Sequence, residues 1–213
     1  MWDSAGPKLA ISMLAMLAVG LTACSSGADH RTSASDATSS STPATTTGLE
    51  RFLLARGEER GYQPSGSVTT ISDVIEYAAG DELTQADVPR LREEGFDRLL
   101  YRPLEGTDRV GITSLVLFSS AAGAQRDSAT DRRNLVRNFR GWTVKRFDIP
   151  GVPGAFGWTA TKPGDSVGNV RWVEGRCVIT IGNAMHNARA SSFVGPLTAG
   201  AQAVHRRVAG QCP

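Results

Sequence analysis

The cysteines are the residues of this 213-residue chain whose chemistry is easiest to specify, and Cys24 comes first. Leu21 stands three residues before it and Ala23 directly before it. This spacing is a lipobox, at which a bacterial precursor is cut before the cysteine and diacylglycerol is attached to its sulfur. Ordinary signal peptidase prefers a small residue where Leu21 stands. We therefore favour lipidation of Cys24, with plain secretion or an uncleaved apolar anchor as the alternatives.

The residues before Cys24 have the layout of an export signal. Residues 9–20 carry no charge and follow Lys8. The run has the length of a signal-peptide apolar core and is too short to span a hydrocarbon layer of about 30 Å. We expect residues 1–23 to be a lipoprotein signal peptide. Two acyl chains on Cys24 would then hold the protein to the outer face of the cell membrane.

The other two cysteines, Cys177 and Cys212, form an even pair once Cys24 is assigned to lipid. Outside the cytoplasm such a pair oxidises readily, so we predict a disulfide between them. It would fasten a C-terminal helix to a strand of a sheet. The alternative is two buried free thiols.

Catalytic and metal-binding motifs are weak in this chain. Ser166 follows Gly164 and Asp165 as in the nucleophile block of GDSL-type esterases, but no Asp-x-x-His follows it. His186 and His205 stand in different predicted elements, with no further ligand at a suitable spacing. The sequence therefore favours a protein that is not an enzyme and uses no cofactor or metal, although a small envelope hydrolase with an unmarked site remains an alternative.

An arginine stripe runs along one predicted helix, formed by Arg126, Arg133, Arg137 and Arg140, and Lys145 and Arg146 follow it. It could contact anionic lipid headgroups or an anionic polymer of the cell wall. The simpler interpretation is a solvated helix face that Asp127 and Asp131 partly neutralise. The formal net charge of +2 gives no reason to expect nucleic acid as a partner.

A second candidate surface comes from aromatic residues late in the chain. Trp158 and Trp172 lie on neighbouring predicted strands, and Arg171 precedes the second of them. A Trp can line a ligand site because it offers a large apolar face with a polar N–H group. The alternative is that both tryptophans belong to the core of the sheet.

The elements that must position these residues form one domain at residues 49–213. Residues 24–48 are rich in Ser and Thr and lack large apolar side chains, so we expect a disordered linker there. Alternating apolar residues predict strands at 98–102, 111–118, 142–147, 155–161, 169–173 and 176–182. Helical periodicity predicts helices at 73–79, 87–94, 119–139 and 196–208. The order indicates an α+β fold, an antiparallel sheet with helices packed on one face, with strand–strand–helix as a candidate duplicated unit.

Four segments together resemble the small lipoproteins of actinobacteria that have no assigned activity: the lipobox ending at Cys24, the Ser/Thr-rich tract, residues 117–124 and residues 149–155. The resemblance implies a location outside the cytoplasm and a rough fold, and it transfers no catalytic residue. We expect an envelope protein that binds an unknown protein or ligand. A solute-binding component of a transporter is a further alternative, although the domain is small for a two-lobed binding protein.

Overall fold

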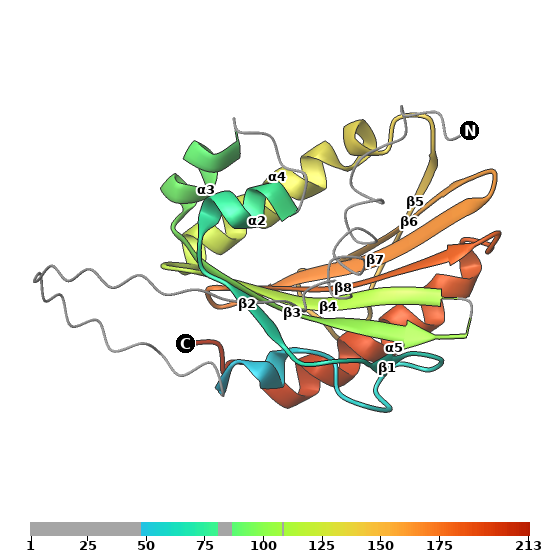
Figure 1. The fold of residues 1–213 in the computed structure, drawn as a ribbon, viewed down its shortest axis with the longest axis horizontal. Coiled ribbons are helices and arrows are strands. Elements are labelled where there is room, and N and C mark those ends of the chain that lie inside the picture. The colour runs from blue at the N-terminus through green and yellow to red at the C-terminus, as the bar shows by residue number, and fades with distance from the viewer. Residues whose placement is uncertain (1–47, 81–86, 108) are drawn as a thin grey trace, which may run out of the picture.

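The computed structural model describes residues 48–80, 87–107 and 109–213, and their centre is an antiparallel sheet of eight strands (Figure 1). The order across the sheet is β1-β3-β4-β8-β7-β6-β5, and β2 also pairs with β3. The long strands form two hairpins, β3–β4 and β7–β8, which meet where β4 pairs with β8. The strand bounds are β1 Gln63–Pro64, β2 Thr69–Ile71, β3 Phe96–Gly106, β4 Arg109–Phe118, β5 Thr143–Phe147, β6 Phe156–Lys162, β7 Asp165–Glu174 and β8 Cys177–His186.

The described helices are close to those that periodicity predicts. They are η3 Glu50–Phe52, α2 Val74–Gly80, α3 Asp87–Glu94, α4 Ala121–Asn138 and α5 Ser191–Val208. The side chain of Ser120 caps α4 by accepting a hydrogen bond from the Gly123 N–H. Helix α5 begins five residues before Pro196, where the sequence predicted its start. The extra turn carries Phe193, which is buried in the core.

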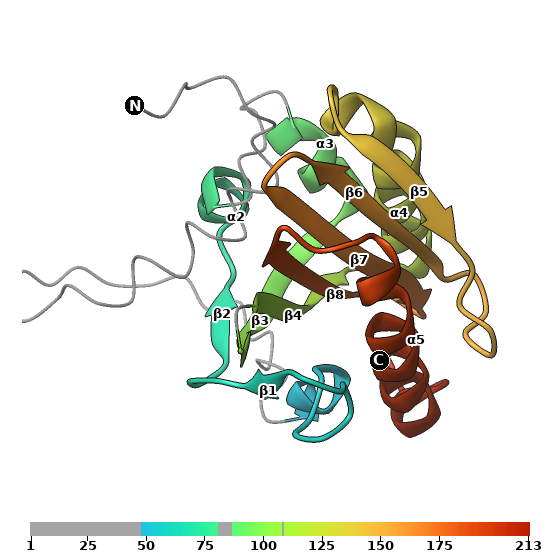
Figure 2. The ribbon, with the colours of Figure 1, turned by 90° about the vertical axis from the view of Figure 1, so that its right-hand side faces the viewer.

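The α+β class and the antiparallel sheet are confirmed, but the helices cover both faces of the sheet rather than one. On β8, Ile179 and Ile181 belong to the cluster that contains α5, whereas Val178 belongs to the cluster that contains Ala124 of α4. Successive strand residues point to opposite faces, so α5 and α4 lie on opposite sides. Figures 1 and 2 show α5 and η3 on one side and α2, α3 and α4 on the other. The physical reason is that this central strand is apolar on both faces, and both need cover.

This arrangement also fails to support the duplicated strand–strand–helix unit. Because β4 and β8 are antiparallel neighbours, a two-fold rotation perpendicular to the sheet relates hairpin β3–β4 to hairpin β7–β8. Such a rotation would leave the two following helices on the same face. Helices α4 and α5 lie on opposite faces. The rotation that superimposes the two hairpins therefore does not superimpose the two strand–strand–helix units.

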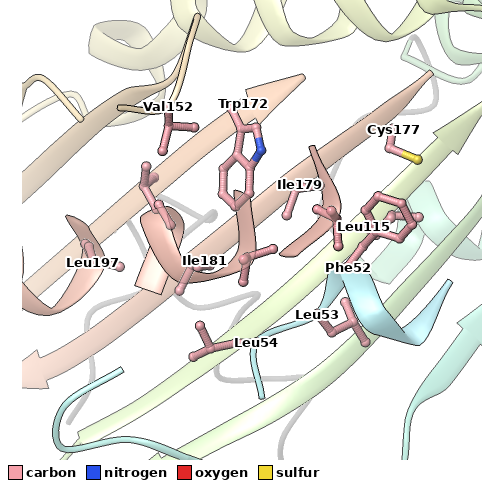
Figure 3. Packing of buried hydrophobic residues seen from close by; sticks show 14 of the residues in the cluster. Phe52, Leu53, Leu54, Leu115, Val152, Trp172, Cys177, Ile179, Ile181 and Leu197 are labelled. Atoms are coloured by element: carbon pink, nitrogen blue, oxygen red, sulfur yellow. The ribbon is translucent and has the colours of Figure 1, made fainter. Parts of the chain in front are cut away.

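The larger part of the core lies between the sheet and the layer formed by η3 and α5. Trp172, Ile179 and Leu197 are buried there, together with Phe52 of η3 (Figure 3). Cys177 opens β8 within the same cluster and forms a disulfide with Cys212, which follows α5. The disulfide therefore ties the tail behind α5 to the central part of the sheet.

Candidate functional site

The three residues of the predicted aromatic surface do not come together. Arg171 and Trp172 are consecutive on β7 and therefore point to opposite faces. Trp172 is fully buried on the α5 side, as Figure 3 shows. Trp158 lies on the α4 side, half-buried, with its ring 4.6 Å from that of Phe139. Only Trp158 and Arg171 thus share a face. Trp158 contacts Phe139, which follows α4, and Arg171 binds Asp127 of α4.

Arg171 belongs to a network of charges between α3, α4 and β7. Asp127 is buried and binds two guanidinium groups, that of Arg171 and that of Arg90 on α3, the latter at 3.2 Å. Asp131, one turn further along α4, binds Arg171 at 2.7 Å. Glu94 binds Arg90 at 2.5 Å, and burial raises the pKa of this glutamate. Both acids of α4 are therefore turned toward the sheet and α3.

This orientation leaves the outer side of α4 strongly basic. Five exposed arginines form what we call the basic face: Arg132, Arg133, Arg137, Arg140 and Arg146. The first three belong to α4, Arg140 follows its end and Arg146 lies on β5. Among the described residues, no carboxylate lies within ion-pair distance of any of the five. The sequence suggested that Asp127 and Asp131 partly neutralise this stripe. In the structure, neither carboxylate forms an ion pair with any of these five arginines.

Local contacts orient several side chains of the basic face. The guanidinium of Arg132 lies over the ring of Phe156 at 5.4 Å. Arg146 donates to the main-chain carbonyl of Arg132 at 3.5 Å, which joins β5 to α4. Arg133 donates to Thr130 at 2.9 Å. Lys145, which the sequence grouped with Arg146, pairs with Thr159 and points to the opposite face of the sheet.

Arg126 belongs to the predicted stripe but differs from the basic face. It is exposed near the start of α4, close enough to Glu94 that its charge partly opposes the rise in the pKa of that carboxyl caused by burial. The part of the stripe without a nearby acid is thus its C-terminal half. The sequence itself carried a signal for this division, since Asp127 and Asp131 stand one turn apart on a different side of the helix from Arg133.

A second polar cluster is buried on the α5 side, and the sequence analysis missed it. Glu59, Tyr62 and Asn183 are each no more than 2% exposed, and the side-chain amide of Asn183 donates to Oε1 of Glu59. Burial raises the pKa of Glu59 to about 7, although this hydrogen bond and the charge of Arg109 lower it. Burial likewise raises the pKa of Tyr62, whose ring lies 5.3 Å from the Arg109 guanidinium.

Oxygen atoms in this buried cluster lack partners. Oε2 of Glu59, Oη of Tyr62 and Oδ1 of Asn183 have no hydrogen-bond partner within the described part of the chain. A neutral Glu59 carries a proton on Oε2 that can be donated, whereas an ionised one adds a second unpaired acceptor. The cluster is therefore compatible with a neutral carboxyl. No local pattern marks it, because Glu59 and Asn183 are 124 residues apart.

The remaining predicted residues are easily placed. Cys24, with the signal peptide and nearly all of the predicted linker, lies outside the described residues. Ser166 is buried and donates to the carbonyl of Ala188 at 2.6 Å. His205 lies 3.3 Å from Glu174, and exposed His186 lies 4.0 Å from Asp165.

Over the described ranges, no group of three His, Cys, Asp or Glu side chains is arranged to hold a metal ion. None of the helices described there is long and apolar enough to cross a membrane.

No protein-family model matches the sequence, and no curated protein matches it. Among solved structures, the fold is similar to the extracellular domain of PknH from Mycobacterium tuberculosis, with 12% sequence identity and a TM-score of 0.45. The similarity covers 76% of this chain and 91% of that domain.

Proposed function

We propose that this chain is an extracytoplasmic lipoprotein, anchored to the outer face of the cell membrane through diacylglyceryl-Cys24. Its globular part is a binding or accessory module of the cell envelope and not an enzyme. The lipobox at Leu21, Ala23 and Cys24 supports the anchor. The disulfide between Cys177 and Cys212 supports the location, because such bonds persist in oxidising compartments.

The observation that carries the binding role is the basic face. Exposed arginines that lack acidic partners are available to an anionic ligand, and the planar guanidinium binds phosphate or carboxylate groups through two hydrogen bonds. In contrast, Asp127 and Asp131 are already engaged with arginines. This part of the molecule therefore favours recognition of anions over acid–base chemistry.

A small hydrolase is the second candidate, and Glu59 is the observation that favours it. A buried carboxyl with a raised pKa is a common feature of general acids and bases. However, Glu59 belongs to the segment that follows η3 and is only 1% exposed. A substrate would reach the carboxyl only if that segment moved away, so the binding role is the better-supported proposal.

The anchor is tested by replacing Cys24 with Ser in the full chain and fractionating the cells. Cys24→Ser should release the protein from membranes or leave it as an uncleaved precursor, and it should abolish incorporation of labelled fatty acid. Cys212→Ser is the matched control, because it removes a different cysteine and should stay lipidated. Retention of labelled fatty acid by Cys24→Ser would overturn the proposal.

The binding role needs its own measurement. Cross-linking in intact cells, followed by purification of the wild-type protein, should recover a specific envelope component. The same component should be lost from a variant in which Arg133, Arg137 and Arg140 are replaced by Gln. Recovery of the same material by both proteins would show that the basic face is not the binding surface.

A further inference from the structure

We propose that the basic face binds anionic phospholipid headgroups of the membrane that carries the anchor. The domain would then rest with the C-terminal half of α4 and the adjoining part of β5 against the bilayer. This inference rests on the proposed function and adds to it a partner and an orientation.

The charge distribution is the first argument. Arg133 and Arg137 are one helical turn apart on the outer side of α4, and Arg140 follows the end of the helix. Arg146 joins them from β5 through its contact with the backbone of α4. An anionic leaflet attracts each such cation near its surface. Phosphodiester groups also match the two-pronged geometry of the guanidinium.

An apolar side chain inside this charged surface is the second argument. Val136 is 62% exposed, whereas the neighbouring Leu135 and Phe139 are buried. Basic residues around an exposed apolar side chain are typical of surfaces that settle at the boundary between headgroups and acyl chains. The long arginine side chains can keep their charges at the headgroups while Val136 contacts the acyl region.

The short reach of the segment between Cys24 and the domain is the third argument. Gly48, where the described chain begins, is only 24 positions after Cys24. Even a fully extended chain of that length spans no more than about 85 Å. A lipidated Cys24 would therefore keep the basic face at a high effective concentration near its own leaflet, where a modest intrinsic affinity is sufficient. The leaflet that holds the anchor is always within this reach, which is why we favour the lipid.

The experiment uses the full chain with Cys24→Ser, so that no acyl chain contributes to binding. Its partition is measured onto vesicles of phosphatidylcholine alone and onto vesicles that also contain phosphatidylglycerol. We expect tighter binding to the anionic vesicles, and we expect salt to weaken it. Replacing Arg133, Arg137 and Arg140 by Gln should weaken anionic binding by about 10- to 100-fold.

The matched control replaces three other exposed arginines, Arg56, Arg60 and Arg206, by Gln. They belong to the η3 and α5 side, and their replacement changes the net charge by the same amount. This variant should retain anionic binding. Equal losses in the two variants would overturn the proposal, because net charge alone would then explain binding. Equal binding of the parent chain to both kinds of vesicle would also overturn it.

A soluble polyphosphate distinguishes the lipid from a polymeric partner. Tight binding of polyphosphate without binding to anionic vesicles would overturn the lipid proposal while leaving an anion-binding envelope module intact. Failure of the anchor is a separate result, because it is read from fatty-acid labelling of Cys24 and not from vesicle binding.

Discussion

The carboxyl of Glu59 accepts a hydrogen bond from the side-chain amide of Asn183, so the loop behind η3 is fastened to the central strand β8. Neighbouring contacts strengthen this attachment. The main-chain N–H of Leu54 donates to Thr113 of β4 at 2.9 Å, and Arg207 of α5 donates to the carbonyl of Leu53 at 2.7 Å. The first described segment of the chain is thus held by both the sheet and α5.

This attachment should depend on pH. The pKa of Glu59 is raised from 4.5 to about 7 in the folded chain. Between these values the folded chain keeps a proton that the unfolded chain has lost, so stability decreases as pH rises through this window and levels off above it. Glu59→Gln mimics the neutral carboxyl and should stabilise the protein at about pH 8 by roughly 1–3 kcal/mol. It should also make the free energy of unfolding vary less with pH between about pH 5 and about pH 7.

Urea unfolding of both proteins across this range measures the effect. Glu93→Gln on α3 is the matched control, because Glu93 is exposed and its replacement should leave the pH dependence unchanged. A Glu59→Gln protein that is less stable than the parent at about pH 8 would mean that the ionised carboxyl is stabilising.

Asp127 should contribute more to stability than Asp131, although both bind Arg171. Asp127→Asn removes the charge that compensates Arg90 and Arg171 inside the network and should cost about 2–3 kcal/mol. The cost is below that of a fully buried pair because the side chains of Arg90 and Arg171 are 26% and 12% exposed. Asp131→Asn should cost less than about 1 kcal/mol, because that side chain is 43% exposed. Equal losses in urea unfolding would contradict this ranking.

The sequence predicted the strands and helices well because periodicity reports local burial. It could not predict which face each helix covers. Trp158 pairs with Asn169 in the sheet, so Trp172, three residues further along β7, must point to the opposite face. The face to which a strand residue points depends on the register of the sheet, and pairing with distant strands sets that register. The sequence-based suggestion that Trp158 and Trp172 share a surface was wrong for this reason.

The polar contacts show the same division between local and long-range information. The side of α4 on which Asp127 and Asp131 lie follows from helical spacing, so their separation from Arg133 could have been predicted. Their partner Arg171 could not, because it is 44 residues away from Asp127. The burial of Glu59 likewise depends on a strand far along the chain.

The disulfide should be a large contribution to stability. Cys177 and Cys212 are 35 residues apart, and a cross-link over a loop of this length stabilises by about 4 kcal/mol in the chain-entropy model. Reduction, or replacement of both residues by Ala, should lower the midpoint of urea unfolding. Reductant should have no further effect on the double variant. An unchanged midpoint after complete reduction would show that the unfolded chain gains little freedom when the bond is broken.

Two helical glycines should respond unequally to replacement by Ala. A Cβ atom at Gly123 would lie 1.8 Å from the carbonyl oxygen of Glu94, so α3 would have to move away from α4. We expect Gly123→Ala to destabilise by about 1–3 kcal/mol, and to weaken the contact between Arg90 and Asp127. A Cβ at Gly195 in α5 meets nothing within 4 Å apart from its chain neighbours, but Pro196 follows it and disfavours a helical conformation for a residue that carries a Cβ. The gain in helix propensity is thus offset, and Gly195→Ala should change stability by less than about 1 kcal/mol.

Thermal unfolding of the two variants tests the close approach of α3 to α4. For a domain of this size a change of 1 kcal/mol shifts Tm by about 2–4 °C, so Gly123→Ala should lower Tm by more than Gly195→Ala does. Because Gly123 follows the cap at Ser120, circular dichroism should accompany the measurement to show that α4 itself is retained. If Gly123→Ala proves as stable as Gly195→Ala, α3 can shift at little cost, and the tight packing that positions Arg90 beside Asp127 is not required for stability.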